Sequence, residues 1–152
     1  MNLKKASFIL IGLFSILLFF SCRQGTSPEK KEFIIPDKNI SFYQHIEPML
    51  EYTCGLESGC HSPTDTQSKL LYVELIDKVS LMNHRLSSTG ERLVNLSIHQ
   101  KNPELAPLYL IVKEGYPNSP EDRMPPYWMN RSPLTDNQIE GIKRWIAEGA
   151  KD

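Results

Sequence analysis

The chain has 152 residues, with 17 Lys and Arg against 18 Asp and Glu and a formal net charge of −1 at pH 7. This balance excludes the strong positive field of a nucleic-acid-binding surface, so no nucleic-acid partner is expected. The length suits one domain preceded by a tether.

The first 21 residues have the pattern of a bacterial export signal. Lys4 and Lys5 precede an apolar run of thirteen residues, Phe8–Phe20. That length is typical of a signal-peptide core and short for a membrane-spanning helix. Ser21 followed by Cys22 is similar to a lipoprotein signal, whose cleavage leaves the cysteine as the acylated first residue. Ordinary secretion and an uncleaved anchor are the alternatives.

Residues 1–21 are therefore interpreted as a lipoprotein signal peptide, with Cys22 as the lipidation site. All three alternatives place the remainder outside the cytoplasm. We expect a location in the cell envelope, facing the periplasm or at the outer membrane, with membrane contact through the lipid anchor. The polar residues 22–39 are predicted to be a flexible linker, and residues 40–152 to be the folded domain.

The folded part is predicted to be all-α. Ser41 can cap a first helix, in which Pro48 is expected to cause a kink or an early end. A second helical stretch is predicted over residues 70–86, with one apolar face. The residues of that face are Leu71, Leu75, Val79 and Met82.

Two further helices follow towards the C-terminus. Pro107 can open a helix that Gly115 stops. Thr135 and Gln138 form a capping box at the start of the last helix, and Gly149 lies just past its end. The apolar face of this helix consists of Ile139, Ile142, Trp145 and Ile146.

Cys54, Cys60 and His61 carry the most specific chemical signal of the chain. Two cysteines with a histidine directly after the second are how a c-type haem is held, through two thioethers and an axial imidazole. The usual spacing has two residues between the cysteines, and here there are five. A plain disulfide between Cys54 and Cys60 and a zinc site that includes His61 remain the alternatives.

Three segments together resemble the small cytochrome c domains of bacterial envelope lipoproteins and planctomycete-type haem proteins. The first runs from Phe42 through Cys60 and His61, the second is residues 107–112, and the third runs from Arg123-Met124-Pro125-Pro126 to the terminal helix. The likeness spans residues 40–150. It implies a cytochrome c fold in which the N- and C-terminal helices cross.

The resemblance implies one covalently attached haem c. Cys54, Cys60, His61 and Met124 would bind it, with His61 and Met124 as axial ligands of the iron. Met129, three other histidines and Arg123 are lesser candidates for contacts with the group. The expected function is one-electron transfer with redox partner proteins, without enzymatic activity. The alternative is a haem-free, disulfide-stabilised envelope lipoprotein that acts as a protein-interaction module.

Overall fold

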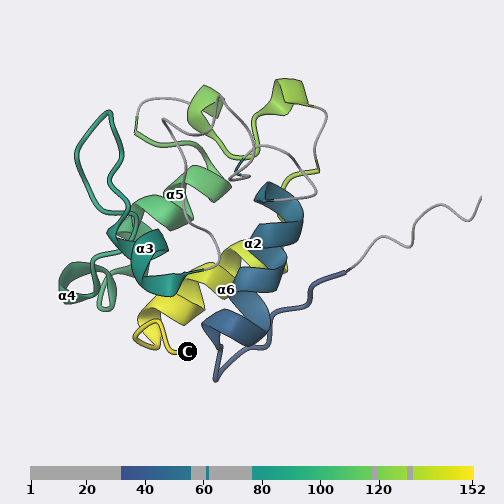
Figure 1. The fold of residues 1–152 in the computed structure, drawn as a ribbon, viewed down its shortest axis with the longest axis vertical. Coiled ribbons are helices and arrows are strands. Elements are labelled where there is room, and N and C mark those ends of the chain that lie inside the picture. The colour runs from purple at the N-terminus through teal and green to yellow at the C-terminus, as the bar shows by residue number, and fades with distance from the viewer. Residues whose placement is uncertain (1–31, 56–60, 62–76, 118–119, 130–131) are drawn as a thin grey trace, which may run out of the picture. The chain divides into compact units, whose positions relative to one another are not determined.

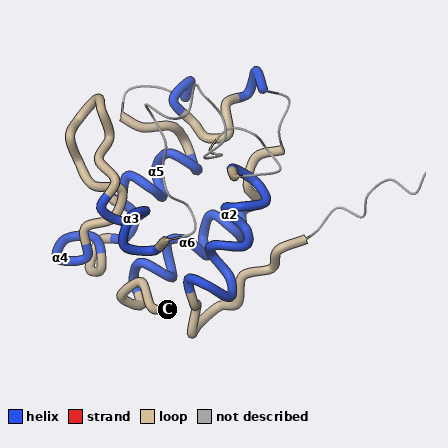
Figure 2. The backbone as a smooth tube through the Cα atoms, viewed as in Figure 1, coloured by secondary structure: helices blue, strands red, loops and turns tan. Residues whose placement is uncertain are grey.

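The computed structural model describes residues 32–55, 61, 77–117, 120–129 and 132–152, and within these ranges the regular structure is helical and contains no strand. A single isolated bridge joins Arg85 and Arg92. The elements are η1 (Phe42–Ile46), α2 (Glu47–Cys54), α3 (Lys78–Asn83), α4 (Leu96–His99), η3 (Pro103–Leu105), α5 (Pro107–Lys113), η4 (Pro120–Asp122), η5 (Tyr127–Met129) and α6 (Asp136–Ala147). Figures 1 and 2 show this arrangement.

The N- and C-terminal helices pack together, as the sequence predicted. The rings of Phe42 in η1 and Trp145 in α6 are both fully buried, with centroids 5.5 Å apart. The carbonyl oxygen of Lys151 accepts hydrogen bonds from the Phe42 N–H at 2.9 Å and from Trp145 Nε1 at 3.0 Å. One carbonyl beyond α6 therefore joins the start of the first helix to the buried tryptophan of the last one.

The first helix changes from π to α winding immediately before Pro48 and continues to Cys54, so the expected early end at Pro48 does not occur. Ser41 caps the helix, since its Oγ accepts the Gln44 N–H at 3.2 Å. The first turn is π-helical, with the Ile46 N–H 3.4 Å from the Ser41 carbonyl oxygen. Pro48 lies at the second position of α2, where a missing N–H costs least. The apolar face that follows buries Met49 and Leu50.

The prediction of one helix over residues 70–86 is wrong. Asp77 is extended and its carboxylate accepts the Ser80 N–H at 2.6 Å, so it caps a short helix, α3, that begins at Lys78 and ends at Asn83. Val79 is exposed and Leu81 is fully buried, which is not the face predicted. The error arises because the prediction used apolar spacing alone. Apolar spacing does not show that the Asp77 side chain binds a backbone N–H and so sets where α3 begins. Leu71 and Leu75 lie outside the described residues.

The predictions for the last two helices are confirmed. α5 begins at Pro107, and Gly115 follows its end with φ of 93°, a conformation that favours glycine. The Thr135 N–H donates to Gln138 Oε1 at 2.9 Å, and the Gln138 N–H donates to Thr135 Oγ1 at 3.4 Å, which completes the capping box. The predicted apolar face of α6 is buried, namely Ile139, Ile142, Trp145 and Ile146.

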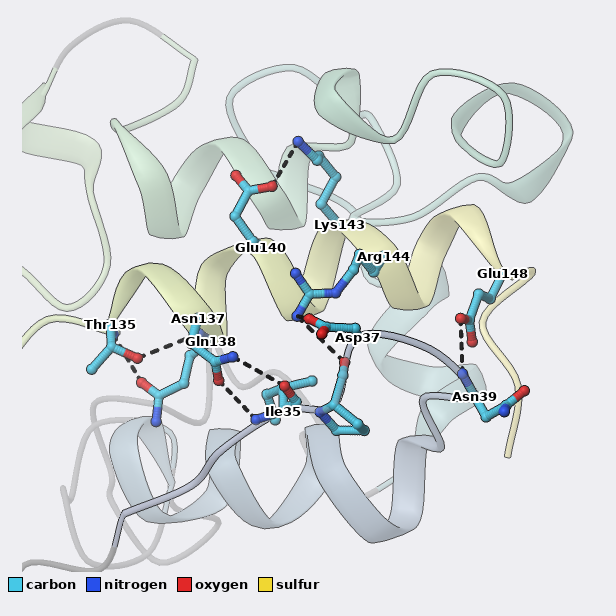
Figure 3. Close-up of polar contacts among 11 residues, drawn as sticks. Ile35, Asp37, Asn39, Thr135, Asn137, Gln138, Glu140, Lys143, Arg144 and Glu148 are labelled. Atoms are coloured by element: carbon cyan, nitrogen blue, oxygen red, sulfur yellow. Dashed lines mark hydrogen bonds and ion pairs between the residues drawn. The ribbon is translucent and has the colours of Figure 1, made fainter.

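The compact unit begins at Phe33, seven residues before the predicted domain boundary at Ile40. Residues 33–40, here called the strap, run along α6 (Figure 3). Asn137 binds Ile35 twice, accepting its N–H at 2.8 Å and donating to its carbonyl at 3.0 Å. The bonds from α6 go to the main chain of the strap, and the apolar residues Phe33, Ile34 and Ile35 were the sequence signal of packing that the linker interpretation overlooked.

Both ends of the strap are held by α6. The side-chain amide of Gln138 donates to the Phe33 carbonyl at 3.1 Å. The carboxylate of Glu148 accepts the N–H of Asn39 at 2.9 Å and that of Ile40 at 2.8 Å. Ile35 is buried in the core cluster between these two points. The strap therefore belongs to the folded domain and runs in the same direction as α6.

Replacing Glu148 by Ala should destabilise the domain, because two backbone N–H groups lose a charged acceptor. We expect a loss of about 1–2 kcal/mol in the free energy of unfolding, measured by denaturant titration. The matched control is Lys38→Ala, which removes an exposed side chain from the same strap and should change stability little. Equal stability of the Glu148→Ala variant and the wild type would show that the strap is not held by this carboxylate.

His99 makes the stability of the domain depend on pH. Its ring is buried and its Nδ1 accepts the Asn95 N–H at 3.0 Å, which requires the neutral imidazole. Burial lowers the pKa of His99 below its usual 6.5, and the Coulombic attraction of Glu91 opposes this shift more weakly. The stabilisation is therefore complete above pH 6.5 and is lost as the pH falls from 6.5 towards the lower folded-state pKa.

We expect the free energy of unfolding of the wild type to fall more steeply between pH 7 and pH 5 than that of His99→Gln. Glutamine keeps an acceptor for the Asn95 N–H and does not titrate, so the comparison isolates the His99 proton. The measurement is denaturant titration at each pH. Parallel curves for the two proteins would contradict the assigned role of His99.

Candidate functional site

The end of α2 holds together two of the residues that the sequence singled out. Cys54 is the last residue of α2, half-buried against the core cluster. The backbone N–H of His61 donates to the Cys54 carbonyl at 2.9 Å. His61 therefore lies beside the end of α2. Cys60, one residue before His61, lies outside the described residues, as does Cys22.

Gly55 explains how the chain leaves α2 at this point. A Cβ atom there would lie 2.7 Å from the carbonyl oxygen of Glu51, which is closer than real Cβ contacts allow. The Gly55 N–H donates to that same carbonyl oxygen at 2.9 Å. Glycine is therefore required by this close approach to the preceding turn of the helix rather than by a positive φ.

The imidazole of His61 is partly withdrawn from solvent. Its Nδ1 is inaccessible to solvent and has no hydrogen-bond partner among the described residues. Burial lowers the pKa of His61 below 6.5, and the nearby His84 lowers it further. The neutral ring is the form that binds a metal ion. A buried nitrogen without a partner is costly in a folded protein and is a feature to be explained by function.

Met124 lies on a loop that is fastened to α5. Its N–H donates to the Ile111 carbonyl at 2.9 Å, and its side chain is half-buried. The preceding Arg123 donates through Nε to the Val112 carbonyl at 3.2 Å and through its N–H to the Pro120 carbonyl at 3.2 Å. Consecutive bonds to the last turns of α5 therefore hold Met124 in place.

Several apolar side chains on the same elements remain half-buried while packing against the core. These are Cys54, Met82, Leu86, Leu110 and Ile111. Leu110 and Ile111 belong to α5, which holds the Met124 loop, and Met82 belongs to α3, which ends at Asn83, directly before His84. The elements that carry the candidate ligands therefore also supply apolar surface that the domain itself does not cover completely.

The rings of the other three histidines differ in the contacts that they make. His45 and His99 each use Nδ1 to accept the N–H of the residue four positions earlier, Ser41 and Asn95 respectively, and so act as helix caps. His84 is half-buried, and burial lowers its pKa. Its electrostatic effect on His61 places the two rings in one neighbourhood. Sequence analysis could not find this proximity, because residues far apart in the chain give no pattern for it.

The aromatic residues near these elements differ in their burial. Tyr109 is buried in the core and donates its hydroxyl to Glu140 Oε1 at 2.9 Å, so it is part of the α5–α6 contact. Tyr127 and Trp128 are exposed, with their rings in edge-to-face contact at 4.9 Å. Among the described residues, no group of three His, Cys, Asp or Glu side chains gathers as a metal-binding set.

No helix in residues 32–55, 77–117, 120–129 or 132–152 combines the length and apolarity needed to cross a bilayer. Comparison with protein-family models, with curated protein sequences and with solved structures finds no match to this chain. The inference of function therefore depends on the residues themselves.

Proposed function

We propose that the chain is a single-haem c-type cytochrome, anchored in the cell envelope by a lipid on Cys22, that transfers one electron between redox partner proteins. The supporting observation is the half-buried His61 imidazole, whose Nδ1 is closed to solvent and without a partner among the described residues and whose pKa is lowered by burial. His61 lies beside the end of the helix that carries Cys54.

The residues present fit a haem c group. Cys54 and Cys60 would attach it through thioethers, and His61 and Met124 would be its axial ligands. The haem supplies the one-electron chemistry, and the protein supplies attachment, ligands and a pocket of low polarity. The crossing of the N- and C-terminal helices agrees with the cytochrome c fold that this proposal implies.

The protein's own residues would hold the ligands of the haem iron and form the surroundings of the haem. The bonds of Met124 and Arg123 to the α5 carbonyls restrict the loop, which favours retention of a weak thioether ligand. Leu110 and Ile111 present apolar surface from the helix beside that loop. Exclusion of water and a Met ligand both raise the reduction potential of a His-ligated haem, which suits an electron carrier.

The first test is covalent haem attachment. The chain should be expressed with the cytochrome c maturation machinery, and the denatured protein should give the pyridine haemochrome spectrum of a c-type haem. His61→Ala should lose stable haem ligation. The matched control is His45→Gln, which alters a helix cap and should retain the spectrum. Mass spectrometry then shows whether Cys54 and Cys60 are bonded to haem or form a disulfide.

An apoprotein mass together with an intact Cys54–Cys60 disulfide would sink the proposal and favour the haem-free interaction module. A haem-bearing protein with one free vinyl group would keep the proposal. It would also show that the five-residue spacing permits a single thioether.

The second test concerns the sulfur ligand. Met124→Ala should abolish the sulfur-to-iron charge-transfer absorption of the oxidised protein and lower its reduction potential, because a thioether ligand stabilises the reduced iron. Met129→Ala is the matched control, since Met129 is the nearest other methionine in the chain. If the spectrum and potential of Met124→Ala equal those of the wild type, Met124 is an ordinary loop residue.

A further inference from the structure

Two arginines lie opposite one another in the segment that follows α3. An isolated antiparallel bridge pairs Arg85 with Arg92. The two hydrogen bonds of this bridge, each 2.9 Å long, are made by the residues directly before and after the pair. Arg85 and Arg92 are therefore a non-hydrogen-bonded pair, the kind in which opposite side chains lie closest to one another. Residues 84–93, which follow α3 in Figure 1, are here called the arginine loop.

The two arginine side chains share one face of the arginine loop. Successive side chains of an extended chain point to opposite faces. On one face, Leu86 packs against the core cluster, and the carboxylate of Glu91 accepts a hydrogen bond from the hydroxyl of Tyr116. Arg85 and Arg92 are the sequence neighbours of these two residues, so they lie on the other face, and both are exposed. This face therefore presents two guanidinium groups to the surroundings of the domain.

The positive charge of the pair is not balanced by a neighbour. Like charges directly opposite one another destabilise a pair of strands. The ion pairs among the described residues involve other cations, namely Lys78, Lys143 and Arg144. The nearest carboxylate in the sequence, that of Glu91, binds Tyr116 instead. The arrangement therefore costs stability, and an anion from outside the domain would relieve the repulsion.

The arginine loop holds the pair in place with hydrogen bonds of its own. The Gly90 N–H donates to the Leu86 carbonyl at 2.7 Å, and Arg85 Nη1 donates to the Gly90 carbonyl at 2.6 Å. At the base of the loop, Leu93 is buried, and its carbonyl accepts the N–H of Leu108 in α5 at 3.0 Å. A ligand of the pair therefore meets a main chain that is already ordered, which lowers the entropic cost of binding.

The donors at the pair favour carboxylate groups as ligands. A guanidinium group is a planar fork of N–H donors that matches the two oxygens of a carboxylate. Phosphate sites commonly add free main-chain N–H groups. In the arginine loop, however, four main-chain N–H groups are already bonded within the loop, namely those of Leu86, Gly90, Glu91 and Leu93. Two forks side by side suit a segment that carries several carboxylates.

We propose that Arg85 and Arg92 form a docking site for an acidic segment of a partner protein, whose carboxylate side chains bind the two guanidinium groups. This proposal goes beyond the proposed function and does not require the haem. Free phosphate is the competing ligand, and the experiment separates the two.

The test is a titration of the full-length protein, labelled with nitrogen-15 and kept reduced, with a hexaglutamate peptide. The Nε–Hε NMR signals of Arg85 and Arg92 should shift together, and hexaglutamine at the same ionic strength should leave them unchanged. Arg92→Gln should bind the peptide about fivefold more weakly, since an exposed charge pair contributes modestly. The matched control is Lys101→Gln, which removes one exposed positive charge elsewhere and should bind as the wild type does.

Equal weakening in Arg92→Gln and Lys101→Gln would overturn the proposal, because net charge alone would then explain the binding. Inorganic phosphate that shifts both signals at the same concentration as the peptide would overturn it in favour of a general anion site. Denaturant titration checks the fold, and Arg92→Gln should be at least as stable as the wild type, because the repulsion is removed. A loss of stability would instead give Arg92 a structural role. The pyridine haemochrome of the same sample reports the haem separately.

Discussion

The packing of Trp145 against Phe42 is the interaction on which the rest of the structure depends. Both rings are fully buried, and the Lys151 carbonyl binds the Trp145 indole and the backbone of Phe42 at once. Removing a buried Trp typically costs about 3–5 kcal/mol, against about 1 kcal/mol for a helix cap. The packing of the first and last helices therefore contributes more to the stability of the domain than the helix caps do.

α6 organises the domain on two sides. On one side, Asn137, Gln138 and Glu148 bind the main chain of the strap, while Ile35 and Ile40 of the strap are buried in the core. On the other side, Glu140 accepts the Tyr109 hydroxyl and pairs with Lys143 at 2.7 Å, which joins α6 to α5. Because α5 in turn holds the Met124 loop, the terminal helix positions both the entry of the chain and the proposed second ligand.

Local signals predicted local structure well. Thr135 and Gln138 identified the start of α6, and Pro107 and Gly115 identified α5, because caps, proline and glycine act within a few residues. The predicted helix over residues 70–86 was wrong because one such local signal was overlooked. The Asp77 carboxylate accepts the Ser80 N–H and caps the start of α3, which the spacing of apolar residues does not reveal.

The sequence by itself determined the helical class, the cap and face of α6, and the types of residue that could hold a haem, because these depend on periodicity and on side-chain chemistry. Only the tertiary structure decided that the Nδ1 of His61 is closed to solvent and unpartnered among the described residues, that Met124 is tied to α5, and that the strap belongs to the domain. Those features arise from contacts between residues distant in the chain. Such contacts depend on how the helices pack, which no local pattern specifies.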